Sequence, residues 1–209
     1  MKDLFTLQQE LQSGALDAQL SALCGAGASA ISEKRSRLLA LIAAFASAFG
    51  AGRTAGLYSS PGRTEMGGNH TDHQHGRVLA GAVDLDMLAC AGPNGTSVAH
   101  ILSAGYPEIT IDLSDLTPQP AEEGTSAALV RGIASRFHDM GFEIGGFDVC
   151  MDSTVLGGSG LSSSAAYEVL IGLISNNLFC GDRADLVNIA QIVQYAENHF
   201  FGKPCGLMD

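Results

Sequence analysis

A glycine- and serine-rich run, GGSGLSSSAA at residues 157–166, has the residue types of an anion-binding turn. It stands between a strand-like segment and a long apolar segment, which predicts a tight turn that leads directly into a helix. Backbone N–H groups and the positive end of the helix dipole favour a phosphate there, and the serine hydroxyls suit phosphate or a phosphate-bound Mg²⁺. The run lacks the lysine of a Walker A loop. A flexible linker with a serine cap is the alternative, but the apolar segment that follows argues against a mere tether.

A second stretch, PGRTEMGGNHTDHQHG at residues 61–76, crowds charged and polar side chains into a glycine-rich loop between two predicted strands. Such a density of polar groups favours a polar ligand. Asn69 and Asp72 can exchange hydrogen bonds with sugar hydroxyls, and Arg63 can serve a carboxylate or a phosphate. The composition therefore indicates a sugar-binding loop.

Two other interpretations of this loop stay open. One is a metal site, although the spacing matches no structural zinc pattern; its ligands would be His70, His73, His75 and Asp72. The other is a solvated loop without a ligand.

The third stretch is residues 182–209, where apolar residues recur every three or four positions. Glu197 falls on this apolar stripe, so the periodicity predicts a helix with a buried carboxylate. Mg²⁺ could satisfy that carboxylate together with a serine hydroxyl and nucleotide phosphates. Pairing with Lys203, or a place at the surface, is the alternative. The segment GKPCGLMD then breaks the helix and presents Asp209 just beyond a glycine.

Composition narrows the possible partners. The chain has 209 residues, of which 46% are hydrophobic and 16% charged, so it can bury a substantial core. Its net charge of -11 would repel a phosphate backbone or an anionic membrane. We therefore expect no nucleic-acid partner and no membrane partner.

The cysteines and the apolar segments indicate the compartment. Five cysteines are scattered without a C-x-x-C pair, so we expect thiols in a reducing cytosol rather than disulfides or a zinc site. The apolar segment at 38–49 is too short to span a bilayer and too far from Met1 for a signal peptide. We therefore expect a cytoplasmic protein.

The elements that must position these stretches alternate between helix and strand. Helices are expected at 4–20, 32–49 and 126–140, and strands near 57–58 and at 109–113 and 147–151. A hairpin is expected between 83–87 and 98–102, joined by the turn residues Pro93, Asn94 and Gly95. The fold class is therefore α+β, a mixed β-sheet with packed helices.

Taken together, the three stretches resemble the galactokinases of the GHMP small-molecule kinase superfamily, from about Tyr58 to the end of the chain. The resemblance implies the fold of a GHMP N-terminal domain and transfer of phosphate from ATP to the anomeric hydroxyl of galactose, with Mg²⁺. It implies Asp209 as proton acceptor and Arg63 as its partner. Sugar binding would involve Arg63, Asn69, His70, Asp72, Gly206 and Asp209; the ATP phosphates would contact Gly158, Gly160, Leu161, Ser162, Ser163 and Ser164; and Mg²⁺ would contact Ser164 and Glu197.

Two positions depart from the family pattern. Asn69 stands where galactokinases usually carry Glu, and Glu65 stands where they often carry Asn. The choice of hexose therefore stays open, with an N-acetylgalactosamine kinase or another hexose kinase as alternatives. A non-catalytic sugar and ATP sensor is a further alternative.

The resemblance also predicts how the chain is organised. Residues 1–54 would form a helical segment packed on the domain, and residues 55–209 a truncated GHMP N-terminal domain. Because the family continues into a second domain, we expect a fragment with negligible turnover on its own.

Overall fold

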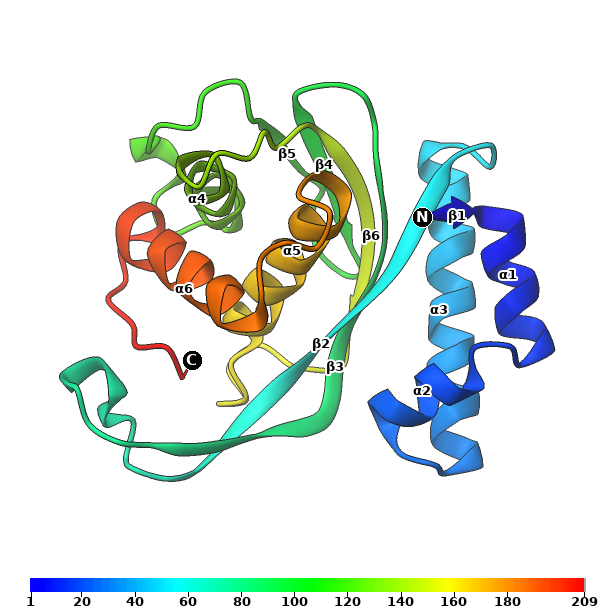
Figure 1. Ribbon diagram of the computed structural model, residues 1–209, viewed down its shortest axis with the longest axis horizontal. Helices are drawn as coiled ribbons and strands as arrows, with labels where there is room; N and C mark the ends of the chain where they lie inside the picture. The colour runs from blue at the N-terminus through cyan, green and yellow to red at the C-terminus, as the bar shows by residue number, and fades with distance from the viewer. Residues whose placement is uncertain (209) are drawn as a thin grey trace.

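The computed structural model describes residues 1–208, and they form one six-stranded sheet with helices on both faces (Figure 1). The strand order is β1-β2-β3-β6-β4-β5. The β4–β6 pair is parallel and the other pairs are antiparallel, so the predicted α+β class with a mixed sheet is confirmed. The strands are β1 (Lys2–Asp3), β2 (Thr54–Gly67), β3 (Leu79–Pro93), β4 (Val98–Ser103), β5 (Ile109–Asp112) and β6 (Phe147–Ser153).

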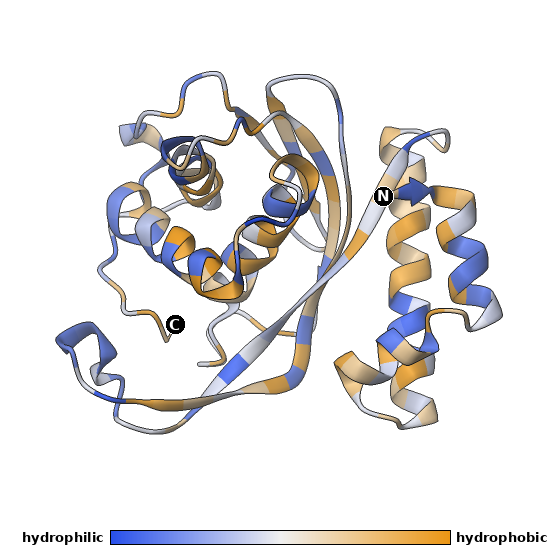
Figure 2. Ribbon diagram, in the orientation of Figure 1, coloured by the Kyte–Doolittle hydropathy of each residue, from blue (hydrophilic) through white to orange (hydrophobic). Residues whose placement is uncertain are grey.

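Three helices, α4 (Ser126–Asp139), α5 (Ser163–Phe179) and α6 (Leu186–Ala196), cover one face of the sheet (Figure 1). They bury the larger apolar cluster, in which Phe137, Leu170 and Ile174 pack against alternate residues of β3, β4 and β6. Apolar colour is dense along α5 and α6 in Figure 2, as expected for helices that line a core. This layer holds the start of α5, where the glycine-rich turn ends.

Three N-terminal helices, α1 (Leu4–Ser13), α2 (Asp17–Cys24) and α3 (Ala28–Phe49), cover the opposite face. The predicted single helix over 4–20 is wrong, because Gly14 adopts a left-handed φ of 79° and its N–H caps α1. The second predicted helix begins at Ala28 rather than residue 32. Among the residues described, no helix combines the length and the apolar character that crossing a membrane requires.

The predicted hairpin between 83–87 and 98–102 is also wrong. Strand β6 lies between β3 and β4 and pairs with both. The turn after β3 is held to the start of β6, since the Asn94 amide donates to Asp148 Oδ1 and to Val98 O at 2.8 Å each. The turn residues therefore lead the chain from β3 to β4, which lies on the far side of β6, instead of back along β3 as in a hairpin.

The true partner of β3 is β2, which extends well beyond the short strand predicted near 57–58. Residues 61–67 of the predicted polar loop belong to β2, and the connection to β3 is correspondingly shorter. The register shifts between Pro61 and Arg63 and again between Glu65 and Gly67. Such bulges re-aim side chains. In Figure 1 this two-stranded arm runs past the helical layers toward the C-terminal end of the chain.

Candidate active site

Arg63 joins three segments that are far apart in the sequence. Its backbone N–H donates to Leu161 O at 3.2 Å, and its side chain donates from Nη1 to Gly160 O at 3.2 Å. Its Nε donates to Met208 O at 3.3 Å. The guanidinium of β2 therefore holds both the glycine-rich turn and the last described residue of the chain.

The glycine-rich turn leaves its backbone open to a ligand. Gly158 and Gly160 have left-handed φ values of 75° and 77°, and a Cβ at either would meet nothing within 4 Å. Ser162, also left-handed with a φ of 54°, is the N-cap residue, and α5 begins at Ser163. The geometry has the features of an anion site: open backbone followed by the positive end of a 17-residue helix.

A polar cavity of about 520 Å³ lies between this turn and the arm. Two cations, Arg63 and Lys203, face it together with the carboxylate of Glu65. Their charges and the start of α5 suit a negatively charged ligand. The lining residues are Arg63, Thr64, Glu65, His70, Gly158, Gly160, Ser162, Ser163, Ser164 and Lys203.

The histidine-rich turn is held at the edge of this cavity. Glu65 Oε1 accepts a hydrogen bond from the His70 N–H at 2.8 Å, and His70 Nδ1 lies 3.3 Å from Asp72 Oδ1. A short 3₁₀ helix, Thr71–Gln74, follows. Asn69, predicted to bind sugar, is exposed with a left-handed φ of 53° and does not line the cavity.

Asp72 joins the histidine-rich turn to the C-terminal segment near Gly206. Asp72 Oδ2 accepts from the Met208 N–H at 2.9 Å. A Cβ at Gly206 would lie 1.8 Å from that same oxygen, so only glycine fits. Burial acts to raise the pKa of Asp72, but hydrogen bonds from the Met208 N–H, the His70 ring and the His73 N–H hold that pKa below its ordinary value. Asp72 is therefore a carboxylate at neutral pH.

Glu197 is buried, at 3% exposure, at the point where α6 gives way to a π-helical turn, Glu197–Phe201. Its Oε1 lies 3.3 Å from Lys203 Nζ, which is the alternative partner that the sequence offered. Lys203 is the one cavity cation that the sequence did not single out as a site residue, although it follows the helix break directly. Asp209, the predicted proton acceptor, lies outside the described residues.

A second cavity, of about 330 Å³ and mostly apolar, adjoins the first through Ser163 and Ser164. Sequence patterns do not predict this cavity, because single residues of many elements line it. The residues lining it include Met87, Ile101, Tyr106, Gly124, Leu129, Val155, Tyr167 and Phe201.

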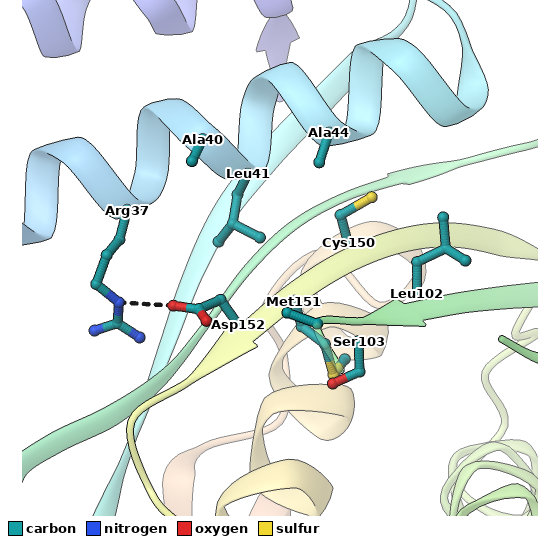
Figure 3. Close-up of a pocket in the computed structure, with 10 residues that line it drawn as sticks. Arg37, Ala40, Leu41, Ala44, Leu102, Ser103, Cys150, Met151 and Asp152 are labelled. Carbon is teal, nitrogen blue, oxygen red and sulfur yellow. Dashed lines mark hydrogen bonds and ion pairs between the residues drawn. The ribbon is translucent and has the colours of Figure 1, made fainter. Parts of the chain in front are cut away.

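A third cavity, of about 440 Å³, lies on the opposite face between α3 and β6 (Figure 3). Ala40, Leu41 and Ala44 form one wall, and the Arg37–Asp152 ion pair, 2.8 Å from Nε to Oδ2, stands at one end. None of the residues singled out in the three motifs lines it.

Two family models match the chain. The galactokinase galactose-binding signature matches residues 43–93, and the GHMP kinases N terminal domain matches residues 128–209. Lactococcus lactis galactokinase, solved in complex with galactose, aligns over 82% of this chain and 45% of its own, with a TM-score of 0.75 and 27% identity. Methanococcus jannaschii mevalonate kinase shares the fold at a TM-score of 0.61 and 14% identity, over 75% of this chain and 50% of its own.

The layered sheet, with a glycine-rich turn opening α5, thus has the fold of the GHMP kinase N-terminal domain. A galactokinase of Clostridium tetani is 32% identical over 153 residues, which are 73% of this chain and 38% of that protein. Within the superfamily, the chain belongs to the galactokinase family. It spans about two fifths of the length of the curated relatives that it matches.

Proposed function

We propose that this chain supplies the sugar site and the ATP-phosphate site of an enzyme that phosphorylates galactose at its anomeric hydroxyl, giving galactose 1-phosphate. The observation that carries the proposal is the set of Arg63 contacts to Gly160 and Met208. These contacts bring the glycine-rich turn and the C-terminal segment to one side chain. The galactokinase relatives supply the substrate class.

On the sugar side, Arg63, His70, Asp72 and Gly206 are the residues proposed to hold galactose. They lie on the cavity wall or directly beside it. Asn69 keeps its proposed role only if the turn moves, since its side chain is outside the cavity wall. Glu65 lines the cavity and offers a carboxylate there. Galactokinases usually carry this glutamate four residues later, at the position of Asn69.

On the nucleotide side, the turn at 158–164 would hold the ATP phosphates, and the adjoining apolar cavity offers a place for the nucleoside. Ser164 and Glu197 would hold Mg²⁺. Both offer the oxygen ligands that this ion prefers. Ser164 lines the polar cavity, whereas Glu197 does not line it and pairs with Lys203, so Mg²⁺ would replace Lys203 as the partner of this buried carboxylate. When bound, Mg²⁺ would neutralise charge on the phosphates.

Placement of the two reactants is the main contribution that these residues would make. The transition state of phosphoryl transfer is loose, so little bond formation to the nucleophile is needed early. Correct placement of the two reactants can lower the activation barrier by about 7–11 kcal/mol. A general base contributes less, about 10²- to 10⁴-fold in rate. Asp209 would accept the hydroxyl proton late in the transfer, which suits a base as weak as aspartate. Arg63 would keep that carboxylate ionised and stabilise the transferring charge.

Ligand titration tests the proposal on the chain as it stands. Galactose should bind in the presence of a non-hydrolysable ATP analogue and Mg²⁺, measured by calorimetry. Arg63→Lys should weaken binding, because lysine keeps the charge but cannot bridge two carbonyls as the planar fork does. Arg77→Lys is the matched control, because Arg77 is an exposed arginine of the connection between β2 and β3 and does not line the cavity. Equal affinity in parent and Arg63→Lys would count against the proposal.

The position of Asn69 outside the cavity wall favours a second candidate, phosphorylation of N-acetylgalactosamine or another hexose. Tighter binding of N-acetylgalactosamine than of galactose would select it. A sugar and ATP sensor would bind both the sugar and ATP without transferring phosphate. It would still transfer none when it is mixed with the part of a related galactokinase that this chain does not cover.

A further inference from the structure

Three metal-ligand side chains gather in the histidine-rich turn. One ligand atom from each of His70, Asp72 and His73 lies within 4.8 Å of the other two. Among residues 1–208, these are the three metal-ligand side chains that lie close enough together to share one ion. His75, which the sequence offered as a fourth ligand, is not part of it.

The turn that carries the group is tightly built. Thr71 Oγ1 donates to Gly68 O at 2.8 Å, and the Gly76 N–H donates to Thr71 O at 2.8 Å. A Cβ at Gly76 would clash with Thr71 Oγ1 and Thr71 O, so this close approach of the two ends of the turn requires glycine. The rings of His70 and His73 lie 6.2 Å apart at 79° and reach the turn surface. A cation would therefore meet three ligand groups that the turn already brings together.

Two imidazoles and one carboxylate are the donor set of zinc-class divalent ions, with a fourth position left for water. Hard cations such as Mg²⁺ prefer oxygen ligands alone. Asp72 offers Oδ1, because Oδ2 accepts the Met208 N–H. The turn thus selects a different ion from the one proposed at Ser164 and Glu197.

We propose that His70, Asp72 and His73 form a binding site for a divalent transition-metal ion, Zn²⁺ or Co²⁺, that excludes the sugar. The exclusion rests on the proposed function, in which His70 and Asp72 hold galactose. A metal that takes His70 Nδ1 or Nε2 and Asp72 Oδ1 occupies the lone pairs that a sugar hydroxyl would use as hydrogen-bond acceptors. Zn²⁺ is then a competitive inhibitor of sugar binding.

The test titrates Zn²⁺ into the full chain, prepared without a His tag, by calorimetry, and follows Co²⁺ by its absorption bands. His73→Gln removes one ligand and should weaken Zn²⁺ binding by about 10- to 100-fold. The matched control, His75→Gln, changes an exposed histidine of the same turn outside the group and should bind as the parent does. Circular dichroism checks that both variants fold.

The metal site is overturned if the parent binds no Zn²⁺, or if His73→Gln and His75→Gln bind it equally. Exclusion is tested separately by titrating galactose with and without Zn²⁺. An unchanged galactose affinity would overturn exclusion, whereas a loss of competition in His73→Gln supports it. Galactose binding to metal-free protein reports on the proposed function alone, so failure of one proposal is distinguishable from failure of the other.

Discussion

Gly206 of the C-terminal segment lies against Asp72 and His73 of the histidine-rich turn. The approach to Asp72 leaves no space for a methyl group. The adjacent hydrogen bond from the Met208 N–H to Asp72 joins the two segments, and we call this pair of contacts the clasp. Any side chain at position 206 must open this clasp or move the turn.

We therefore predict that Gly206→Ala weakens galactose binding by about tenfold, which corresponds to about 1.4 kcal/mol. Overpacking at the contact should also cost about 1–3 kcal/mol in the free energy of unfolding. Gly52→Ala is the control, because a Cβ there meets nothing within 4 Å. Calorimetry with galactose measures the first effect, and a parent-like affinity in Gly206→Ala would show that the clasp is not needed.

The buried thiols give a second prediction for single residues. Cys90 and Cys150 face each other across β3 and β6, and burial raises their pKa values to about 12 and about 11. At pH 8 both stay protonated, and a protonated thiol is a poor nucleophile. In native protein we expect iodoacetamide to label the partly exposed Cys24 and Cys205 first. Mass spectrometry of labelled peptides checks this order, which rapid labelling of Cys90 would contradict.

Most residues that line the polar cavity could be singled out from the sequence, because they lie in short motifs that are rich in polar and charged side chains. Arg63, His70 and the serines of the turn indeed line one cavity. The sequence offers Lys203 only as a partner of Glu197, because a single lysine after a helix break has no local pattern that marks it as a cavity residue. Asn69 is expected on the sugar side, but it is exposed and does not line the cavity, whereas its neighbour His70 does, and no local pattern distinguishes the two placements.

At the scale of elements, α3 is fixed to the sheet by charges as well as by apolar packing. Asp86 of β3 is buried and pairs with Lys34 and with Arg37, whose Nη1 lies 2.6 Å from Asp86 Oδ1. Ser59 of β2 donates to the same carboxylate at 3.0 Å. The network joins α3 to the two strands of the arm at their base.

Lys34→Met should lower the free energy of unfolding by about 3 kcal/mol at neutral pH, because it leaves a buried carboxylate short of one partner. Lys2→Met is the control, since Lys2 pairs with Glu10 at the surface and such a pair contributes at most about 1 kcal/mol. Urea unfolding measures both. Equal destabilisation by the two substitutions would contradict a special role for the buried pair.

The effect of Lys34→Met should also depend on pH. Burial acts to raise the pKa of Asp86, but Lys34 and Arg37 together lower it below its ordinary value of 3.8. A lowered pKa means that the stabilisation is fully present above pH 3.8 and is lost as pH falls through the lowered value. The difference between parent and variant should therefore shrink in acid. Urea titrations across that range check the sign, and a difference that grows in acid would refute it.

Element prediction succeeded where periodicity is long and failed where pairing depends on distant strands. The helix at 126–140 and the strand at 147–151 were found within two residues of their bounds. Strand β4 was found as well, but its partner was wrong, because the insertion of β6 depends on side-chain contacts of Asn94 that a local pattern cannot reveal. Strand β2 was cut short because its polar half resembles a loop.

At the scale of the whole molecule, two apolar clusters share one sheet. Phe137 lies in the cluster under α4 to α6, and Phe45 lies in the cluster under α1 to α3. Adjacent residues of β3 point into opposite clusters: Ala89 contributes to the first and Leu88 to the second. The strands between the clusters therefore couple the N-terminal helices to the layer that holds the glycine-rich turn.

This coupling predicts a single cooperative unfolding transition. Phe45→Ala and Phe137→Ala each remove a fully buried ring and should lower the free energy of unfolding by about 3–5 kcal/mol. Phe5→Ala, at a position 67% exposed, should change it by less than about 0.5 kcal/mol. Circular dichroism follows the whole chain, and native-state hydrogen exchange reports each layer. If Phe45→Ala frees the amides of α1 to α3 while those of α4 to α6 keep their protection, the two layers fold independently and the shared sheet does not couple them.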